Sequence, residues 1–129
     1  MIRIHPRHTE YAGLRTLLVV HGCITLAAGI VLSVAPGLIP GIVGIHLDPR
    51  ANMLAYLLAG AEFGFAALSF GGSRLGDRRA LRLIAWSCIV FHASTGVLES
   101  YAYARGASAA ILANVAARAV IVALFAYLA

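Results

Sequence analysis

The 129-residue chain is 61% hydrophobic, only 12% charged and carries a net charge of +5. Soluble domains average about 45–50% apolar and about 25% charged residues, so this composition excludes an ordinary water-soluble domain. The apolar residues also stand in long blocks, not in the periodic stripes of a soluble core. We therefore expect an integral membrane protein.

Four apolar blocks are long enough to cross a hydrocarbon core of about 30 Å as helices. They cover residues 14–35, 52–70, 83–104 and 108–128. Unpaired peptide groups are costly in lipid, and the blocks lack the alternation of a barrel, so each block is expected to be helical. The prediction is one all-α domain over residues 1–129. It is a four-helix transmembrane bundle with up-down-up-down topology, in which short connections make consecutive helices antiparallel neighbours.

Arginine residues predict the orientation of this bundle. Seven of them precede the first block or flank the second connection, whereas the first and third connections carry only Arg50 and Arg105. Positively charged segments stay on the cytoplasmic side. We therefore expect the N-terminus and the middle connection to be cytoplasmic, and four crossings return the C-terminus to that side.

The same composition bears on location and partners. Ten basic residues, all arginine, together with abundant alanine and glycine are typical of a GC-rich bacterial genome, so we expect a multi-pass protein of the bacterial inner membrane. Topology and contact with anionic lipid headgroups explain the positive charge, and no nucleic-acid partner is expected. A homo-oligomer or a membrane partner protein stays open.

Polar side chains lie deep inside the predicted spans. Ionisable groups there cost at least about 2.5–3.5 kcal/mol each on insertion scales, so they rarely occur without a partner or a use. The set comprises His21, Glu62, His92, Glu99 and Arg118, with Asn114 as a neutral sixth member. Counting about 1.5 Å of rise per residue places three of them, Glu62, His92 and Arg118, near the midplane.

Helical spacing predicts which of these groups face each other. His92 and Glu99 lie two turns apart on one face, and Asn114 and Arg118 lie one turn apart on another. Both faces are expected to point into the bundle, where Arg118 pairs with Glu99 or with the carboxyl of the second span. This arrangement predicts a polar pocket tilted toward the outer leaflet.

The glycines around Glu62 suggest a helix contact. Gly60 and Gly64 are four residues apart, a spacing that permits the close approach of another helix.

Such a pocket suits an acid–base enzyme that acts on a lipophilic small molecule. Burial disfavours the ionised form of a carboxyl group, whereas a nearby arginine favours it, so two carboxyls can divide the acid and base roles. The predicted catalytic residues are Glu62, His92, Glu99 and Arg118, and the predicted substrate-binding residues are Asn114, Tyr56, Thr95 and His21. The suited reactions are isomerisation, cyclisation, dehydration and epoxide opening, none of which requires a redox cofactor.

Three alternatives compete with the enzyme. His21 and His92 lie at similar depths, which allows a bis-histidine haem or a metal site, although no span has metal-type spacing and an arginine at this depth repels a cation. A small transporter or an accessory subunit of a membrane complex is the second alternative, and the same arginine opposes a cationic cargo. In the third, the polar groups only fix how the helices pack.

The chain also shows a layout seen elsewhere. A Gly/Pro-rich connection over residues 36–49 is followed by a basic connection over residues 71–79 and by Val90, Phe91 and His92 in the third block. In these features the chain resembles families of small uncharacterised bacterial four-span integral membrane proteins, which have no settled activity. The resemblance implies architecture only.

Overall fold

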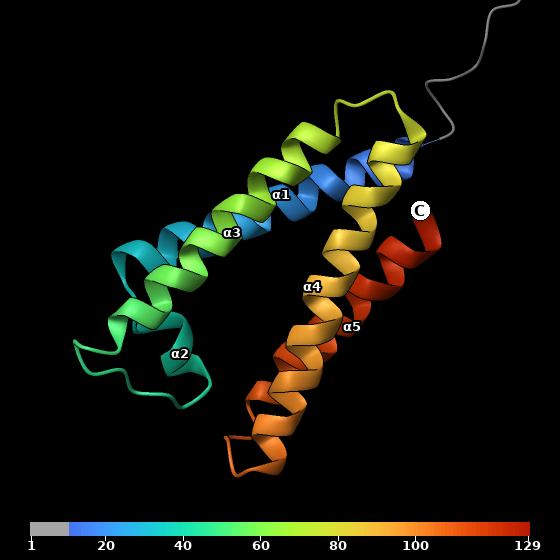
Figure 1. Cartoon of the computed structure of the whole chain (residues 1–129). Coiled ribbons are helices and arrows are strands. Elements are labelled where there is room, and N and C mark those ends of the chain that lie inside the picture. Colours follow the sequence, from blue (N-terminus) through green and yellow to red (C-terminus); the bar gives the residue numbers. More distant parts are fainter. Residues whose placement is uncertain (1–10) are drawn as a thin grey trace, which may run out of the picture.

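The computed structural model describes residues 11–129 and contains only helices and connections in this range (Figure 1). The helices are α1 (Ala12–Val34), α2 (Leu38–Ile42), α3 (Asn52–Gly72), α4 (Arg78–Ala104) and α5 (Ile111–Leu128). Four of them, α1, α3, α4 and α5, are long and apolar enough to cross a membrane. The predicted all-α class and the four predicted blocks are therefore confirmed.

Helix α4 begins at Arg78, five residues before the apolar block that predicted it. The preceding residue, Asp77, has an extended backbone, and its carboxylate accepts hydrogen bonds from the backbone N–H groups of Arg79 and Ala80 at 3.3 and 3.1 Å. An aspartate at this position satisfies donors that the first turn leaves unpaired. Because these first residues are arginines, hydropathy alone does not detect them as helix.

The four long helices form two pairs that diverge from one end of the molecule (Figure 1). Helix α1 packs along α3, and α4 packs along α5. The pairs meet near the α3–α4 connection (Figure 1). Farther from this connection, Phe65 of α3 and Phe91 of α4 stack with ring centroids 4.3 Å apart. The predicted neighbours are thus correct within each pair, whereas α3 and α4 contact each other only over a short part of their lengths. In a membrane, an apolar helix surface is as stable against lipid as against another helix, so helices associate only where their surfaces fit closely.

Two apolar clusters mark the closely packed regions. At the joined end, residues of α1, α4 and α5 share one core of fully buried side chains: Leu14, Leu18, Leu81, Ala85, Cys88 and Phe125. At the diverging end, the cluster of Leu32, Ala55 and Ala59 belongs to α1 and α3 alone, with Ile39 and Leu47 of the α1–α3 connection against it. The joined end therefore holds the two pairs together.

Close approach between α1 and α3 depends on the glycines of α1. A Cβ atom at Gly29 would lie 2.7 Å from Phe63 Cε1, and one at Gly22 would lie 2.9 Å from Phe70 Cε1. Gly60 and Gly64 of α3 have no atom within 4 Å of such a Cβ position. The predicted helix contact at this second pair of glycines is therefore wrong, because phenylalanine rings of α3 pack against the glycines of α1 instead.

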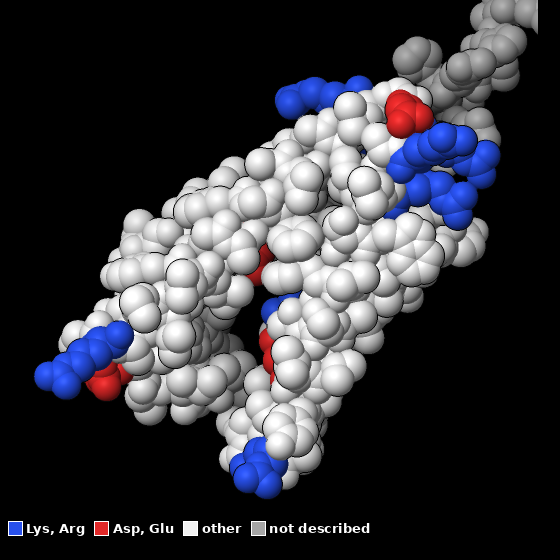
Figure 2. Space-filling model, in the orientation of Figure 1, with Lys and Arg blue, Asp and Glu red and all other residues white. Residues whose placement is uncertain are grey.

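The diverging pairs leave an opening between them, which the space-filling view shows with charged atoms on its walls (Figure 2). We call it the lateral window. The Phe65–Phe91 stack joins the two pairs on one side. On the other side, the loop after α2 reaches the α4–α5 connection, where a Cβ on Gly44 would lie 3.4 Å from Ser108 Cβ. Gly44 has a φ of +77°, a conformation that glycine adopts without strain.

Basic side chains gather at the joined end of the molecule (Figure 2). The α3–α4 connection and the first turns of α4 supply Arg74, Arg78, Arg79 and Arg82. Arg15 of α1 adds a hydrogen bond from its guanidinium to the Leu75 carbonyl at 2.8 Å, which ties α1 to this connection.

Candidate functional site

A series of hydrogen-bonded polar side chains crosses all four long helices. Ser69 Oγ of α3 lies 2.8 Å from His21 Nδ1 of α1, and His21 Nε2 lies 2.8 Å from His92 Nε2 of α4. The other ring nitrogen of His92 lies 3.2 Å from an NH1 group of Arg118 on α5. The serine and the two histidines are almost fully buried.

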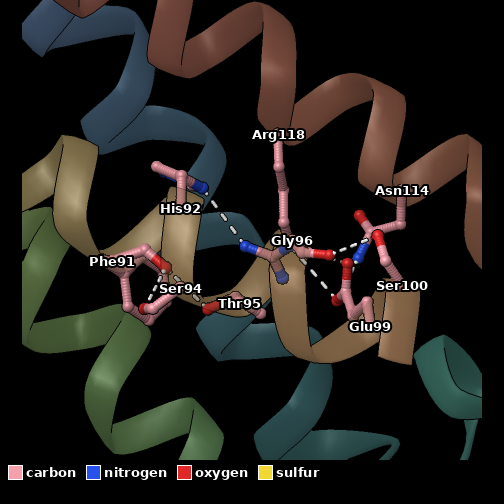
Figure 3. A network of polar contacts seen from close by, with 9 residues as sticks. All are labelled: Phe91, His92, Ser94, Thr95, Gly96, Glu99, Ser100, Asn114 and Arg118. Atoms are coloured by element: carbon pink, nitrogen blue, oxygen red, sulfur yellow. Dashed lines mark hydrogen bonds and ion pairs between the residues drawn. The ribbon is translucent and has the colours of Figure 1, made fainter. Parts of the chain in front are cut away.

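Arg118 continues the series to the carboxylate of Glu99 (Figure 3). Its Nε–H group lies 3.2 and 3.1 Å from the two carboxylate oxygens, and Asn114 Nδ2 donates to Oε1 of the same carboxylate at 2.7 Å. The sequence left Glu62 and Glu99 as alternative partners of Arg118, and the structure shows Glu99. The shared faces predicted for α4 and α5 are confirmed. We call the six residues the polar network: Ser69, His21, His92, Arg118, Glu99 and Asn114.

Arg118 determines the direction of the hydrogen bonds among the histidines. A guanidinium has only donors, so His92 Nδ1 must accept and the proton of a neutral His92 lies on Nε2. His92 therefore donates to His21 Nε2, and His21 Nδ1 donates to Ser69 Oγ. Each of these imidazole nitrogens has one partner, which is consistent with two neutral rings.

The two carboxyl groups of the long helices have different surroundings. Glu99 is paired with Arg118 and accepts from Asn114, and both side chains of the ion pair are mostly buried, at 16% and 13% exposed. Glu62 on the inward face of α3 is 8% exposed and has no hydrogen bond to any residue between 11 and 129. Arg118 is near enough for a Coulombic interaction with Glu62. The two carboxyls therefore differ in their hydrogen bonds and in their distance from a counter-charge.

A groove on the surface of α4 and α5 also reaches the polar network. It encloses about 500 Å³. Its lining includes His92, Gly96, Val97, Ser100, Arg118 and Val122. A groove of this volume with mainly apolar walls and few polar groups is typical of small-molecule sites. The network is thus accessible from the lipid-facing side of this pair.

The histidine pair does not fit a bis-histidine metal or haem site. With metal–nitrogen distances of about 2.0–2.1 Å, two imidazoles on one ion stand roughly 3.3–4.1 Å apart. The two Nε2 atoms lie 2.8 Å apart, which is a hydrogen-bond distance. Within residues 11–129, no three His, Cys, Asp or Glu side chains are grouped so that they could hold a metal ion.

Two predicted substrate-binding residues lie apart from the polar network. Thr95 is half-buried, and its hydroxyl donates to the Phe91 carbonyl of its own helix at 2.7 Å. Tyr56 is 50% exposed on α3 and makes no hydrogen bond within the described part of the chain.

Sequence reasoning missed two residues of the site. Ser69 lies seven residues after Glu62 and hence on the same face of α3, which is the pattern that could have indicated it. Phe125 packs edge-on against the His21 ring, with centroids 5.3 Å apart. No polar feature marks this phenylalanine in the sequence.

Comparison of the chain with protein-family models, with curated proteins and with solved structures finds no match. The resemblance to bacterial four-span proteins therefore stays a prediction. The fold and the site define a four-span candidate membrane protein with a buried histidine-containing polar network.

Proposed function

We propose that this protein is a membrane enzyme that carries out acid–base chemistry on a lipophilic small molecule held in the lateral window. The observation that carries the proposal is the contrast between its two carboxyls. Glu99 has its counter-charge in Arg118, whereas Glu62 is buried with no hydrogen-bond partner in the described chain. Glu62 is therefore available to give a proton to a substrate or to take one from it.

The polar network supplies complementary roles. Arg118 and Asn114 present N–H donors beside the window and can stabilise negative charge that develops on a substrate oxygen. His92 is held by hydrogen bonds at both ring nitrogens. We assign His92 to positioning Arg118, and we assign direct proton exchange with substrate to Glu62.

The apolar surroundings of the site favour a lipophilic substrate. The window lies between helices whose outward side chains are apolar, and the groove of α4 and α5 offers about 500 Å³ beside Arg118. A molecule dissolved in the membrane would enter sideways. The reactions suited to these residues are isomerisation, cyclisation, dehydration and epoxide opening.

We also propose the orientation of the protein in a bacterial inner membrane. The joined end, with its cluster of arginines, faces the cytoplasm together with both termini. The diverging end carries Arg50 and Arg105 and faces outward. The window then opens within the bilayer, toward its outer leaflet.

Deuterium labelling tests the enzymatic proposal and does not require the substrate to be identified first. The purified protein in nanodiscs is incubated in D₂O with a total lipid extract of the cells to which it is native, and mass spectrometry follows the extracted molecules. We expect wild type to produce a species that gains carbon-bound deuterium or the mass of heavy water, and we expect Glu62→Gln to produce none. Equal labelling by both proteins would reject Glu62 as the acid–base group.

Transport is a second candidate, favoured by one observation. The sequence suggested that Arg118 would repel a cationic cargo, but its charge is compensated by Glu99 at 3.1 Å. Uptake of a lipophilic amine into proteoliposomes, driven by a proton gradient and absent in Glu62→Gln, would support a transporter over an enzyme.

A further inference from the structure

We infer that the ligand of the lateral window is a lipophilic amine, and that Glu62 holds it as an ammonium ion after giving it a proton. The inference deepens the proposed function and depends on its placing of the ligand site in the window. It follows from the charges, the hydrogen bonds and the burial of the side chains around the window.

Within the described chain, one arginine and two carboxyl groups lie around the window. Arg118 is the only arginine there that lies away from helix ends and connections. Its Nε–H group contacts both oxygens of Glu99, and its NH1 group donates to His92. Glu62 is thus a second buried carboxyl beside a cation that already has an anionic partner.

The two histidines of the polar network cannot take up a proton without losing a contact. His21 is bonded through Nδ1 to Ser69 and through Nε2 to His92. His92 Nδ1 accepts from Arg118. Glu62 therefore has the free capacity for exchange with a ligand, since it forms no hydrogen bond to residues 11–129.

An amine fits this site because its binding leaves the total charge unchanged. A neutral amine enters from the lipid, the O–H bond of the Glu62 carboxyl breaks, and its proton forms an N–H bond on the amine nitrogen. The products are a carboxylate and an ammonium ion in contact. No isolated ion is left in the apolar interior, where it would be very costly, and the resulting charge-assisted hydrogen bond is stronger than a neutral one.

Other ligand classes fit less well. A carboxylic acid would, on ionising, place a third carboxylate beside one arginine that is already paired. An alcohol can hydrogen-bond to Glu62, but it supplies no counter-charge for a carboxylate.

Matched photoactivatable probes test the inference. Three probes share one diazirine-bearing alkyl chain and end in a primary amine, a hydroxyl or a carboxylate, and each is titrated into wild type in nanodiscs of zwitterionic lipid at neutral pH. We expect the amine to label residues of the window at a half-saturating concentration at least about tenfold below that of the alcohol. Glu62→Gln should remove this difference, and Glu62→Asp should retain it. Ser87→Ala, which alters a half-buried serine bonded only to its own helix, should label like wild type.

A second measurement needs no variant. A hydrophobic carbodiimide modifies a protonated carboxyl within the membrane, and peptide mass spectrometry locates the modification. We expect the amine probe, and not the alcohol probe, to protect Glu62 of the wild-type protein.

The outcomes separate the two proposals. If the alcohol labels the window and protects Glu62 as well as the amine does, the window remains a ligand site and the amine class is rejected. Strongest labelling by the carboxylate would also overturn the inference, because Arg118 would then be the anchor. If no probe labels the window, the ligand site and the inference both fail.

Discussion

The joined and diverging halves of the same four helices differ in how their apolar and polar side chains connect the two helix pairs. At the joined end, α1, α4 and α5 share a fully buried core, and the histidines and Ser69 have partners at hydrogen-bond distance. At the diverging end, the apolar core belongs to one pair, and Glu62 lacks a hydrogen-bond partner in the described chain. The joined half therefore links the two helix pairs, whereas the diverging half leaves one carboxyl without a partner in the described chain.

This division follows from membrane energetics. Without a hydrophobic force between helices, association depends on close packing and on hydrogen bonds between them. The joined half has both, through its core and through the bond between His21 and His92. The diverging half has few contacts between the pairs and can keep an unsatisfied group. The variants below test this division, beginning with the largest expected effect.

Removing Arg118 should affect both halves. Arg118→Ala leaves the Glu99 carboxylate without its counter-ion and His92 without its donor, and breaking a buried ion pair in this way costs about 3–5 kcal/mol. We expect the free energy of unfolding to fall by an amount near the lower limit, because the Glu99 carboxyl can become neutral by taking up a proton. We also expect loss of function. Equilibrium unfolding in mixed detergent micelles measures the change. Arg105→Ala, in the α4–α5 connection, is the matched control, and an equal effect of both would contradict the central position of Arg118.

Replacing Glu62 should affect function alone. Glu62→Gln keeps the size of the side chain and removes no hydrogen bond within residues 11–129, so unfolding should be unchanged. Loss of a general acid or base typically lowers the rate by about 10²–10⁴-fold, and we expect a decrease in this range in the deuterium-labelling assay. A large loss of stability would show instead that Glu62 is a packing residue.

Two glycine substitutions should differ in stability. Gly29→Ala places a Cβ 2.7 Å from the Phe63 ring, whereas Gly60→Ala places one in open space. Both changes raise helix propensity equally, so the difference in free energy of unfolding between the two variants reports packing alone. We expect Gly29→Ala to be about 1–2 kcal/mol less stable than Gly60→Ala, as is typical of overpacking. If Gly60→Ala were the less stable of the two variants, the helix contact that the sequence predicted at Gly60 would be supported.

The smallest effect is expected at the histidine pair. His21→Leu removes a buried ring that bonds Ser69 and His92, and side-chain hydrogen bonds between membrane helices average about 0.6 kcal/mol and reach about 1.7 kcal/mol. We expect unfolding to be easier by an amount in this range. Ser87→Ala, which loses only a bond to its own helix, should leave stability unchanged. No change in His21→Leu would show that the histidines do not hold the two helix pairs together.

Much of the polar network could be predicted from the sequence. His92 with Glu99, and Asn114 with Arg118, are related by helical periodicity, so their shared faces follow from the helix once the helix is known. The partner of Arg118 could not be predicted, because the sequence offers two carboxyls within the spans. That choice depends on the packing of α4 along α5 and on the divergence of α3 from α4.

The sequence by itself determined the all-α class, the four apolar helices and the list of polar residues within them, because hydropathy and helical periodicity are local properties of the chain. The tertiary structure decided that the bundle divides into two pairs and that Arg118 selects Glu99. It also decided that the glycines of α1, and not those of α3, mediate close packing. These features depend on the fit of particular side chains across helices distant in sequence, and in lipid no general hydrophobic force fixes that fit in advance.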